Sequence, residues 1–257
     1  TVLRFAKLQM VGSQWRKYEE SLFQSGLNEV SEGTESNIEI SVVGIEENSI
    51  GSDNKSPYVV PPGIPRDIDN TTIVQRRTNE QSLQLCFDNL SDGDGRAIYK
   101  ESNFDLINYG RIKMFIHAEP NKGDFLRDDE INAFLRFGSD YENNYYEIEL
   151  PLKITQPSLI DQNSTGLSRV IWPEENEINL SIEELLSLKS QRNRENIDVS
   201  LPFSKPSANG KYIIRIKGRP SMGSILNFMI GVKNPLSTDR ASKSACLWFN
   251  ELRLTDF

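Results

Sequence analysis

The stretch "DNLSDGDGRA", residues 88 to 97, comes closest to a metal site in the type and spacing of its residues. Asp88, Asp92 and Asp94 would supply hard carboxylate oxygens, which Ca²⁺ prefers, and the two glycines among them would permit a tight loop. The glutamate at the twelfth position of an EF-hand loop is missing, so a plain acidic turn is the alternative. A second acidic loop, residues 124 to 130, has the same character. Calcium at these aspartates is the one cofactor that the residues suggest.

A pair of glutamates lies in the stretch "YENNYYEIELPLKIT", residues 141 to 155, which alternates like a strand with one buried face. Strand geometry places Glu147 and Glu149 on one face, about 7 Å apart. Two carboxylates could carry out glycoside hydrolysis, but such pairs are usually solvated charge. We expect Tyr145, Glu147 and Glu149 to form a solvated or partner-facing surface without chemistry. The opposite face is expected to be core: Tyr146, Ile148, Leu150 and Leu152.

His117 is the only histidine, so the chain offers neither a multi-histidine metal site nor a histidine relay. It alternates with Phe115 along a strand-like run, which is typical of a packed or surface-strand histidine rather than a catalytic one. Exposed aromatic rings could form a platform for sugars. The candidates are Trp15, Trp172 and Trp248. We expect Trp248 in the core and Trp172, at a strand end before a proline, as the most open of the three.

Composition excludes several classes of function. The chain of 257 residues carries a net charge of -8, which argues against a nucleic-acid partner and against docking on anionic lipid. It has no run of about 18 apolar residues, so we expect no membrane-spanning helix and no direct insertion into a membrane. The sequence begins at Thr1 rather than Met, which suggests a fragment or a processed product.

Strands follow one another regularly from residue 80, separated by Gly, Pro, Asn or Asp turn signals. The eight expected strands cover residues 82–90, 97–106, 110–119, 131–140, 145–155, 210–218, 224–234 and 246–254. Only one stretch, residues 181 to 192, looks helical, because Ser181 and Glu184 have capping-box spacing and apolar residues follow at i, i+3 and i+4. The pattern predicts a mainly β fold, a jelly-roll-like antiparallel two-sheet sandwich with one short helix in a crossover loop. The acidity and the helix favour this sandwich over the wall of a membrane barrel.

The N-terminal part is expected to be separate. Residues 1–37 would comprise a strand, within residues 1–24, and a linker. They would be the end of a preceding module and would pack apart from the sandwich. The sandwich domain would span residues 38–257 and include a strand at 38–45. A long Pro- and Gly-rich loop, residues 48–79, is either functional, wrapped on a partner, or an ordered surface loop.

Nine blocks, taken in order, resemble the SprA/Sov family, very large outer-membrane proteins of gliding and secreting Bacteroidetes. The blocks are "VGSQWRKYEE", "GIEEN", "YVVPPGIPRDID", "NEQSLQL", "DGDGRAIYK", "LINYGRIKMFIHAE", "LRFGSDYENNYYEIELPLKIT", "VIWPEENEI" and "LWFNELRLTDF". Each block alone is uninformative, but the ordered set is specific and runs over nearly the whole chain.

The resemblance implies a part of the type 9 secretion translocon, a giant single-chain β-barrel that passes folded cargo across the outer membrane and supports gliding motility. This chain would be a soluble, non-catalytic cap or scaffold domain of that protein, exposed at the cell surface or, as the alternative, in the periplasm. The implied partners are other type 9 secretion components, cargo proteins and the outer-membrane barrel of the same chain. The family supplies no catalytic motif to carry over.

Two other classes of function stay open. The first is a carbohydrate-binding jelly-roll module, which a concave face with two open aromatic rings would favour. The second is a carboxylate-pair glycoside hydrolase, which a deep cleft holding one glutamate with a raised pKa would favour.

The two cysteines lie in the first and the last strand of the expected sandwich, which are commonly antiparallel neighbours. Cys86 and Cys246 would then be close, and a location outside the cytoplasm, implied by the resemblance, would let a disulfide persist. However, Cys86 alternates with polar residues, whereas Cys246 shares a side with Trp248 and Leu252. Two separate buried thiols are the alternative, and the pairing stays open at this point.

Overall fold

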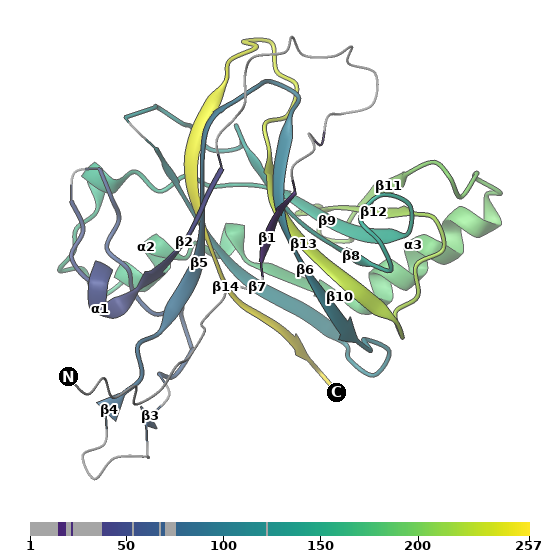
Figure 1. Cartoon of the computed structure of the whole chain (residues 1–257), viewed down its shortest axis with the longest axis horizontal. Helices are drawn as coiled ribbons and strands as arrows, with labels where there is room; N and C mark the ends of the chain where they lie inside the picture. Colours follow the sequence, from purple (N-terminus) through teal and green to yellow (C-terminus); the bar gives the residue numbers. More distant parts are fainter. Residues whose placement is uncertain are drawn as a thin grey trace, which may run out of the picture.

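Two antiparallel β-sheets face each other and enclose the main hydrophobic core (Figure 1). The computed structural model describes residues 15–18, 22, 38–52, 54–66, 68–69, 76–121 and 123–257. The mainly β, two-sheet sandwich expected from the sequence is confirmed.

The larger sheet has seven strands in the order β1-β6-β13-β8-β9-β12-β11. These strands are β1 (Arg16–Tyr18), β6 (Gly95–Phe104), β8 (Asn132–Gly138), β9 (Tyr145–Pro151), β11 (Phe203–Pro206), β12 (Ile213–Lys217) and β13 (Ile225–Lys233).

The smaller sheet has five strands in the order β10-β7-β14-β5-β2. These strands are β2 (Ile38–Gly44), β5 (Gln81–Leu90), β7 (Arg111–Pro120), β10 (Ile178–Ser181) and β14 (Lys243–Thr255). Two short strands, β3 (Ile68–Asp69) and β4 (Arg76–Arg77), pair with each other as a separate ribbon.

The chain crosses between the sheets in a jelly-roll-like manner. Strands β5, β6, β7 and β8 alternate between the two sheets; β13 then inserts between β6 and β8, and β14 between β5 and β7. All eight long strands expected from the sequence are present. Strands β10 and β11, with four residues each, were not expected, because so short a run carries little alternation.

The expected helix is confirmed as α3 (Ile182–Arg194). The Ser181 hydroxyl caps it by accepting from the N–H of Glu183 at 3.3 Å, whereas Glu184 turns away to the N–H of Ala208 at 2.8 Å. The structure adds elements too short for a periodicity signal. They are α1 (Ile45–Asn48), α2 (Leu167–Ile171) and the 3₁₀ turns η1 (Pro157–Leu159) and η2 (Glu174–Asn176).

Strand β9 shows how alternation builds the core. Tyr146, Ile148 and Leu150 have no exposed surface, and they point between the two sheets. Ile148 lies opposite Leu135 of β8 and Ile214 of β12, so three apolar side chains form one row across the sheet. The core expected here, with Leu152 as its last member, is confirmed.

The N-terminal segment does not pack apart where the structure describes it. Arg16–Tyr18 pairs antiparallel with Ala97–Tyr99 and forms one edge of the seven-stranded sheet. The expectation of a separate N-terminal strand is therefore wrong for these residues, because a jelly roll can recruit a distant strand to its edge. Most of the expected strand 1–24 and of the linker lies outside the described residues. The domain boundary after residue 37 stays a prediction.

Part of the long loop packs on the outer face of the five-stranded sheet. Tyr58 is buried, and its ring centroid lies 5.6 Å from that of Trp248 and 6.1 Å from that of Trp172. The indole N–H of Trp172 donates to the Val59 carbonyl at 2.7 Å. This part of the loop is therefore an ordered cover over a second small apolar cluster.

The first and last strands of the expected sandwich, β5 and β14, are neighbours, as predicted. Cys86 lies directly opposite Cys246 in this ladder, their Cα atoms are 4.0 Å apart, and a disulfide joins them. The pairing that the sequence left open is thus a bridge.

Candidate functional site

The acidic turn proposed for calcium connects β5 to β6. The Asp88 carboxylate accepts from an asparagine side chain at 2.8 Å, and Asp92 accepts from the N–H and the hydroxyl of Ser237 at 2.9 and 3.0 Å. Asp94 is buried and forms an ion pair with Arg96 at 3.2 Å. The structure therefore does not bring the three carboxylates together, because each one holds a different neighbour.

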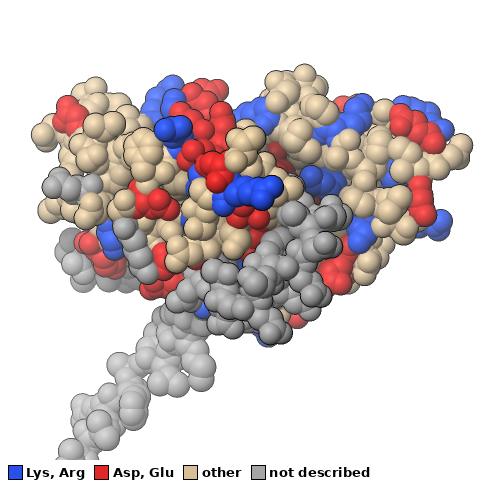
Figure 2. Space-filling model, turned by 90° about the horizontal axis from the view of Figure 1, so that it is seen from above, with Lys and Arg blue, Asp and Glu red and all other residues tan. Residues whose placement is uncertain are grey.

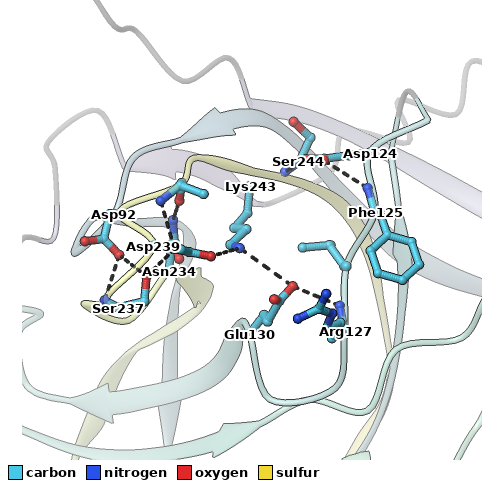
Figure 3. Close-up of polar contacts among 12 residues, drawn as sticks. Asp92, Asp124, Phe125, Arg127, Glu130, Asn234, Ser237, Asp239, Lys243 and Ser244 are labelled. Atoms are coloured by element: carbon cyan, nitrogen blue, oxygen red, sulfur yellow. Dashed lines mark hydrogen bonds and ion pairs between the residues drawn. The ribbon is translucent and has the colours of Figure 1, made fainter.

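The second acidic loop lies near this turn and is tied into the same loop end (Figure 3). The Lys243 ammonium lies 3.1 Å from the carboxylate of Asp239 and 3.7 Å from that of Glu130. The Asp124 carboxylate accepts from the N–H of Ser244 at 2.9 Å. Within the described ranges, no group of three or more His, Cys, Asp or Glu side chains could hold a metal ion. Calcium binding at these loops stays a prediction.

Five charged side chains from four adjacent strands meet on the outer face of the seven-stranded sheet. We call them the charged cluster: Glu147 and Glu149 of β9, Arg136 of β8, Arg215 of β12 and Lys233 of β13. Both arginines lie directly opposite Glu147 in their ladders. Lys233 Nζ is 2.7 Å from Glu147 and 2.6 Å from Glu149, and Arg215 contacts both carboxylates.

The charged cluster is largely shielded from solvent. Glu147 is 0% exposed and Glu149 is 6% exposed. The Arg136 guanidinium lies 4.1 Å from the centroid of the Tyr145 ring, which is itself buried, and Lys233 lies over an adjacent phenylalanine. The expected solvated surface of Tyr145, Glu147 and Glu149 is therefore wrong. Alternation separates the two faces of a strand, but it does not say whether the outer face is covered.

The neighbouring cations keep both glutamates ionised. Burial raises the pKa of Glu147, but Lys233, Arg136 and Arg215 together outweigh burial and hold this pKa far below its ordinary value. The pKa of Glu149 is also lowered, since Lys233 again outweighs burial and the repulsion from Glu147. A general acid needs a carboxyl that is protonated near neutral pH, so this pair has the wrong ionisation for glycoside hydrolysis.

Of the two placements expected for His117, packed or on a strand surface, the structure shows the packed one. Its ring is fully buried and lies 4.0 Å, centroid to centroid, from the ring of Trp248. Nδ1 is 2.8 Å from the Ile171 carbonyl oxygen, which can only accept, so Nδ1 carries the proton. Nε2 lies 3.5 Å from Glu119, whose carboxylate also accepts from the N–H of Ser56 at 2.8 Å.

The tryptophans do not form an open sugar platform. Trp248 is buried, as expected, but the expectation that Trp172 is open is wrong, because it is only 2% exposed under the loop that carries Tyr58. Trp15 is partly exposed and packs at the edge of the main core. Two open aromatic rings on one concave face, the arrangement that would favour carbohydrate binding, are not found among these three.

A groove opens at one end of the sandwich, where the last residues of β6 and β14 approach each other. Its volume is about 470 Å³, and most of its lining is apolar. The lining residues are Trp15, Lys100, Ser102, Phe104, Asp105, Tyr109, Ile112, Phe228, Leu252, Arg253 and Leu254.

Sequence reasoning missed the partners of the two glutamates. Arg136, Arg215 and Lys233 each stand in a strand that was correctly expected, and each faces outward. These three residues can be recognised as partners of the two glutamates only once the strand order is known, since they are up to 97 positions apart in the sequence. A charge within an otherwise apolar strand, such as Arg136 in "AFLRFG", is the one local hint.

Surface charge is mixed in sign. On the face shown in Figure 2, Lys and Arg side chains are interspersed with Asp and Glu side chains. This agrees with the acidic composition and gives no basic stripe on that face for a phosphate backbone. None of the helices in the described ranges has both the length and the apolar run needed to cross a membrane.

Comparison with known proteins gives one result over the whole length. The family SprA_N, described as a motility related/secretion protein, matches residues 1–257. No curated protein matches the sequence.

Proposed function

The chain belongs to the SprA_N family of motility-related secretion proteins, and on this premise we propose that it is a non-catalytic cap or scaffold domain of the type 9 secretion translocon. In this role it supports export of proteins across the outer membrane and gliding motility. Its partners are the outer-membrane barrel of the same chain, other secretion components and cargo proteins.

The observation that carries the proposal is the family match over residues 1–257. It agrees with the ordered sequence blocks that run through both sheets, from Trp15 near β1 to the end of β14. The match names motility and secretion. The type 9 system, the translocon and the cap or scaffold role go beyond this description and are what we propose.

The contacts made by the buried charged and polar side chains support a structural role. Glu147 and Glu149 are held ionised by three cations, and His117 is bonded and stacked in a covered cluster. Such groups contribute to a fixed arrangement of strands and loops. They lack the open approach that acid–base catalysis requires, and the lowered pKa of the two glutamates is the opposite of what a general acid needs.

The disulfide supports a location outside the cytoplasm. Structural disulfides persist in oxidising compartments and are rare in the cytosol. The bridge between Cys86 and Cys246 fits the outer face of the outer membrane or, as the alternative, the periplasm. We propose the cell surface.

The role is tested in the full-length protein in its own cells. An in-frame deletion of the segment from β5 to β14 should abolish export of secreted proteins and spreading on agar, while the outer-membrane barrel is still detected. A matched strain carrying Leu236→Asp, an exposed loop substitution, should export and spread normally. A deletion strain with normal export and normal motility would contradict the proposal.

The side of the membrane is tested by inserting a specific protease site at Asn209–Gly210, an exposed turn with open space around Gly210. Cleavage in intact cells is expected for the cell surface. Cleavage only after the outer membrane is permeabilised would place the domain in the periplasm.

A further inference from the structure

The groove at the end of the sandwich lies between two strand edges that no strand of the described residues pairs. Strand β14 pairs with β5 only from Lys243 to Phe249, and its last residues, Leu252–Thr255, extend beyond the start of β5. On one side, Arg253, Leu254 and Thr255 pair with β7; on the other side, no described strand pairs with Leu252–Thr255. Open edges present unpaired N–H and C=O groups, which can accept an additional strand.

Strand β6 lies across the groove, and the edge at its end has no partner in the described part of the chain. Its pairing with β1 ends at Tyr99, so Ser102–Phe104 have no partner on that side among the described residues. Both ends reach the lower side of the molecule in Figure 1, where the arrowheads of β6 and β14 lie close to the C-terminus.

Apolar side chains line the space between these edges. Phe104 is 47% exposed and Leu252 is 38% exposed, although both line a concave surface. Phe228 forms the buried floor, with its ring centroid 5.5 Å from that of Phe104. A volume of about 470 Å³ lies within the range of ligand pockets, so several apolar side chains of a ligand would find contacts here.

One cationic side chain of the groove, that of Lys100, is not used by the described residues. The Lys100 side chain forms no ion pair or hydrogen bond within the described part of the chain. The Arg253 guanidinium, by contrast, lies 3.8 Å from the Glu251 carboxylate and 5.4 Å from the centroid of the Phe115 ring. The one carboxylate of the lining, that of Asp105, is occupied by the N–H of Ile107 at 2.9 Å. The lining thus carries two cations against one carboxylate in a chain with a net charge of -8, and the unengaged Lys100 ammonium is complementary to an acidic group.

We propose that the groove binds an extended polypeptide segment of a partner protein by strand addition. The segment pairs its backbone with Leu252–Thr255, places alternate apolar side chains against Phe104 and Phe228, and sets one acidic side chain beside Lys100. Strand addition takes affinity from main-chain hydrogen bonds and specificity from pockets for alternate side chains. The inference is carried by the groove alone and does not rest on the scaffold role proposed above.

The test measures fluorescence polarisation of a labelled peptide against the whole 257-residue chain. The probe is an acetylated nonapeptide pool with threonine at even positions, glutamate at position five, and a mixture of valine, leucine and phenylalanine at the other odd positions. Leu252→Asp and Phe104→Asp should each weaken binding about tenfold or more, the loss expected for a central interface side chain. Leu236→Asp, an exposed leucine outside the groove, should bind like the wild type.

A charge exchange at Lys100 distinguishes loss of the binding site from loss of the fold. Lys100→Glu should weaken binding of the glutamate pool and strengthen binding of a pool with lysine at position five. A pool with proline at every even position should not bind, because it cannot pair as a strand.

Three results would overturn the proposal. They are absence of binding by the glutamate pool, equal binding by the proline pool, and self-association of the chain that Leu252→Asp abolishes. The second would indicate a site for apolar ligands without strand addition, and the third a second copy of this chain.

Discussion

Cys86 and Cys246 lie directly opposite each other on β5 and β14, and their side chains are bonded on the outer face of the five-stranded sheet. Trp248, two residues from Cys246, points to the same face and is buried there under the loop that carries Tyr58. The sequence suggested opposite sides for the two cysteines only because a buried tryptophan was assigned to the space between the sheets. Burial on the outer face removes that conflict.

The bridge should contribute strongly to stability. It closes a separation of 160 residues, for which the chain-entropy model gives about 5 kcal/mol. Reductant should therefore lower the free energy of unfolding of the wild type, measured in urea, to that of the double variant Cys86→Ala, Cys246→Ala. The double variant itself should not respond to reductant. Two free thiols, counted on the unfolded wild type without reductant, would contradict the bridge.

Alternation along single strands predicted the part of the fold that depends on local pattern. The inward row of Tyr146, Ile148 and Leu150 follows from a period of two residues, and so do the eight long strands. The helix followed from a capping serine and apolar spacing, because both signals lie within about a dozen residues.

The outer faces could not be predicted in the same way. Whether Glu147 meets water depends on Arg136, Arg215 and Lys233, which arrive from three other strands. The burial of Trp172 depends likewise on a loop more than a hundred residues earlier in the sequence. Such contacts are set by strand order and loop path, which one sequence does not reveal.

Neutralising Glu147 should be costly. Glu147→Gln leaves three cations beside the single remaining carboxylate of Glu149, and removing one partner of a buried ion pair typically costs roughly 3–5 kcal/mol. The control is Glu101→Gln, which removes an exposed pair with Arg16 at 3.9 Å and should cost less than about 1 kcal/mol. The free energy of unfolding of both variants is measured by urea denaturation. Equal, small effects would show that the charged cluster is solvated after all.

The same cluster predicts the response to acid. The pKa of Glu147 is held below its ordinary value of 4.5, so the folded chain keeps this carboxylate ionised where the unfolded chain binds a proton. Its contribution to stability is complete above pH 4.5 and is lost progressively as the pH falls below that value. Glu147→Gln should therefore show a shallower loss of stability between about pH 5 and pH 2, while Glu101→Gln should run parallel to the wild type. Parallel curves for all three proteins would exclude the depressed pKa.

Two buried tyrosines should respond in opposite ways to loss of the hydroxyl. The hydroxyl of Tyr146 is buried without a hydrogen-bond partner among the described residues, whereas that of Tyr212 accepts from the N–H of Asn179 and donates to the Glu177 carbonyl, both at 2.9 Å. Tyr146→Phe should leave the free energy of unfolding unchanged or raise it by up to about 1 kcal/mol. Tyr212→Phe should lower it by roughly 1–3 kcal/mol, because the N–H of Asn179 loses its acceptor, although the Glu177 carbonyl keeps the Lys211 ammonium at 2.6 Å.

Alkaline pH gives the first of these variants a second, independent readout. Burial raises the pKa of Tyr146 from 10.0 to about 12, so the unfolded chain loses this proton before the folded chain does. The contribution of the neutral phenol to stability is complete below pH 10 and is lost as the pH rises toward 12. Tyr146→Phe should therefore flatten the loss of stability above pH 10, measured by urea unfolding at a series of pH values. A large loss of stability in Tyr146→Phe at neutral pH would instead reveal a partner for this hydroxyl that the described residues do not supply.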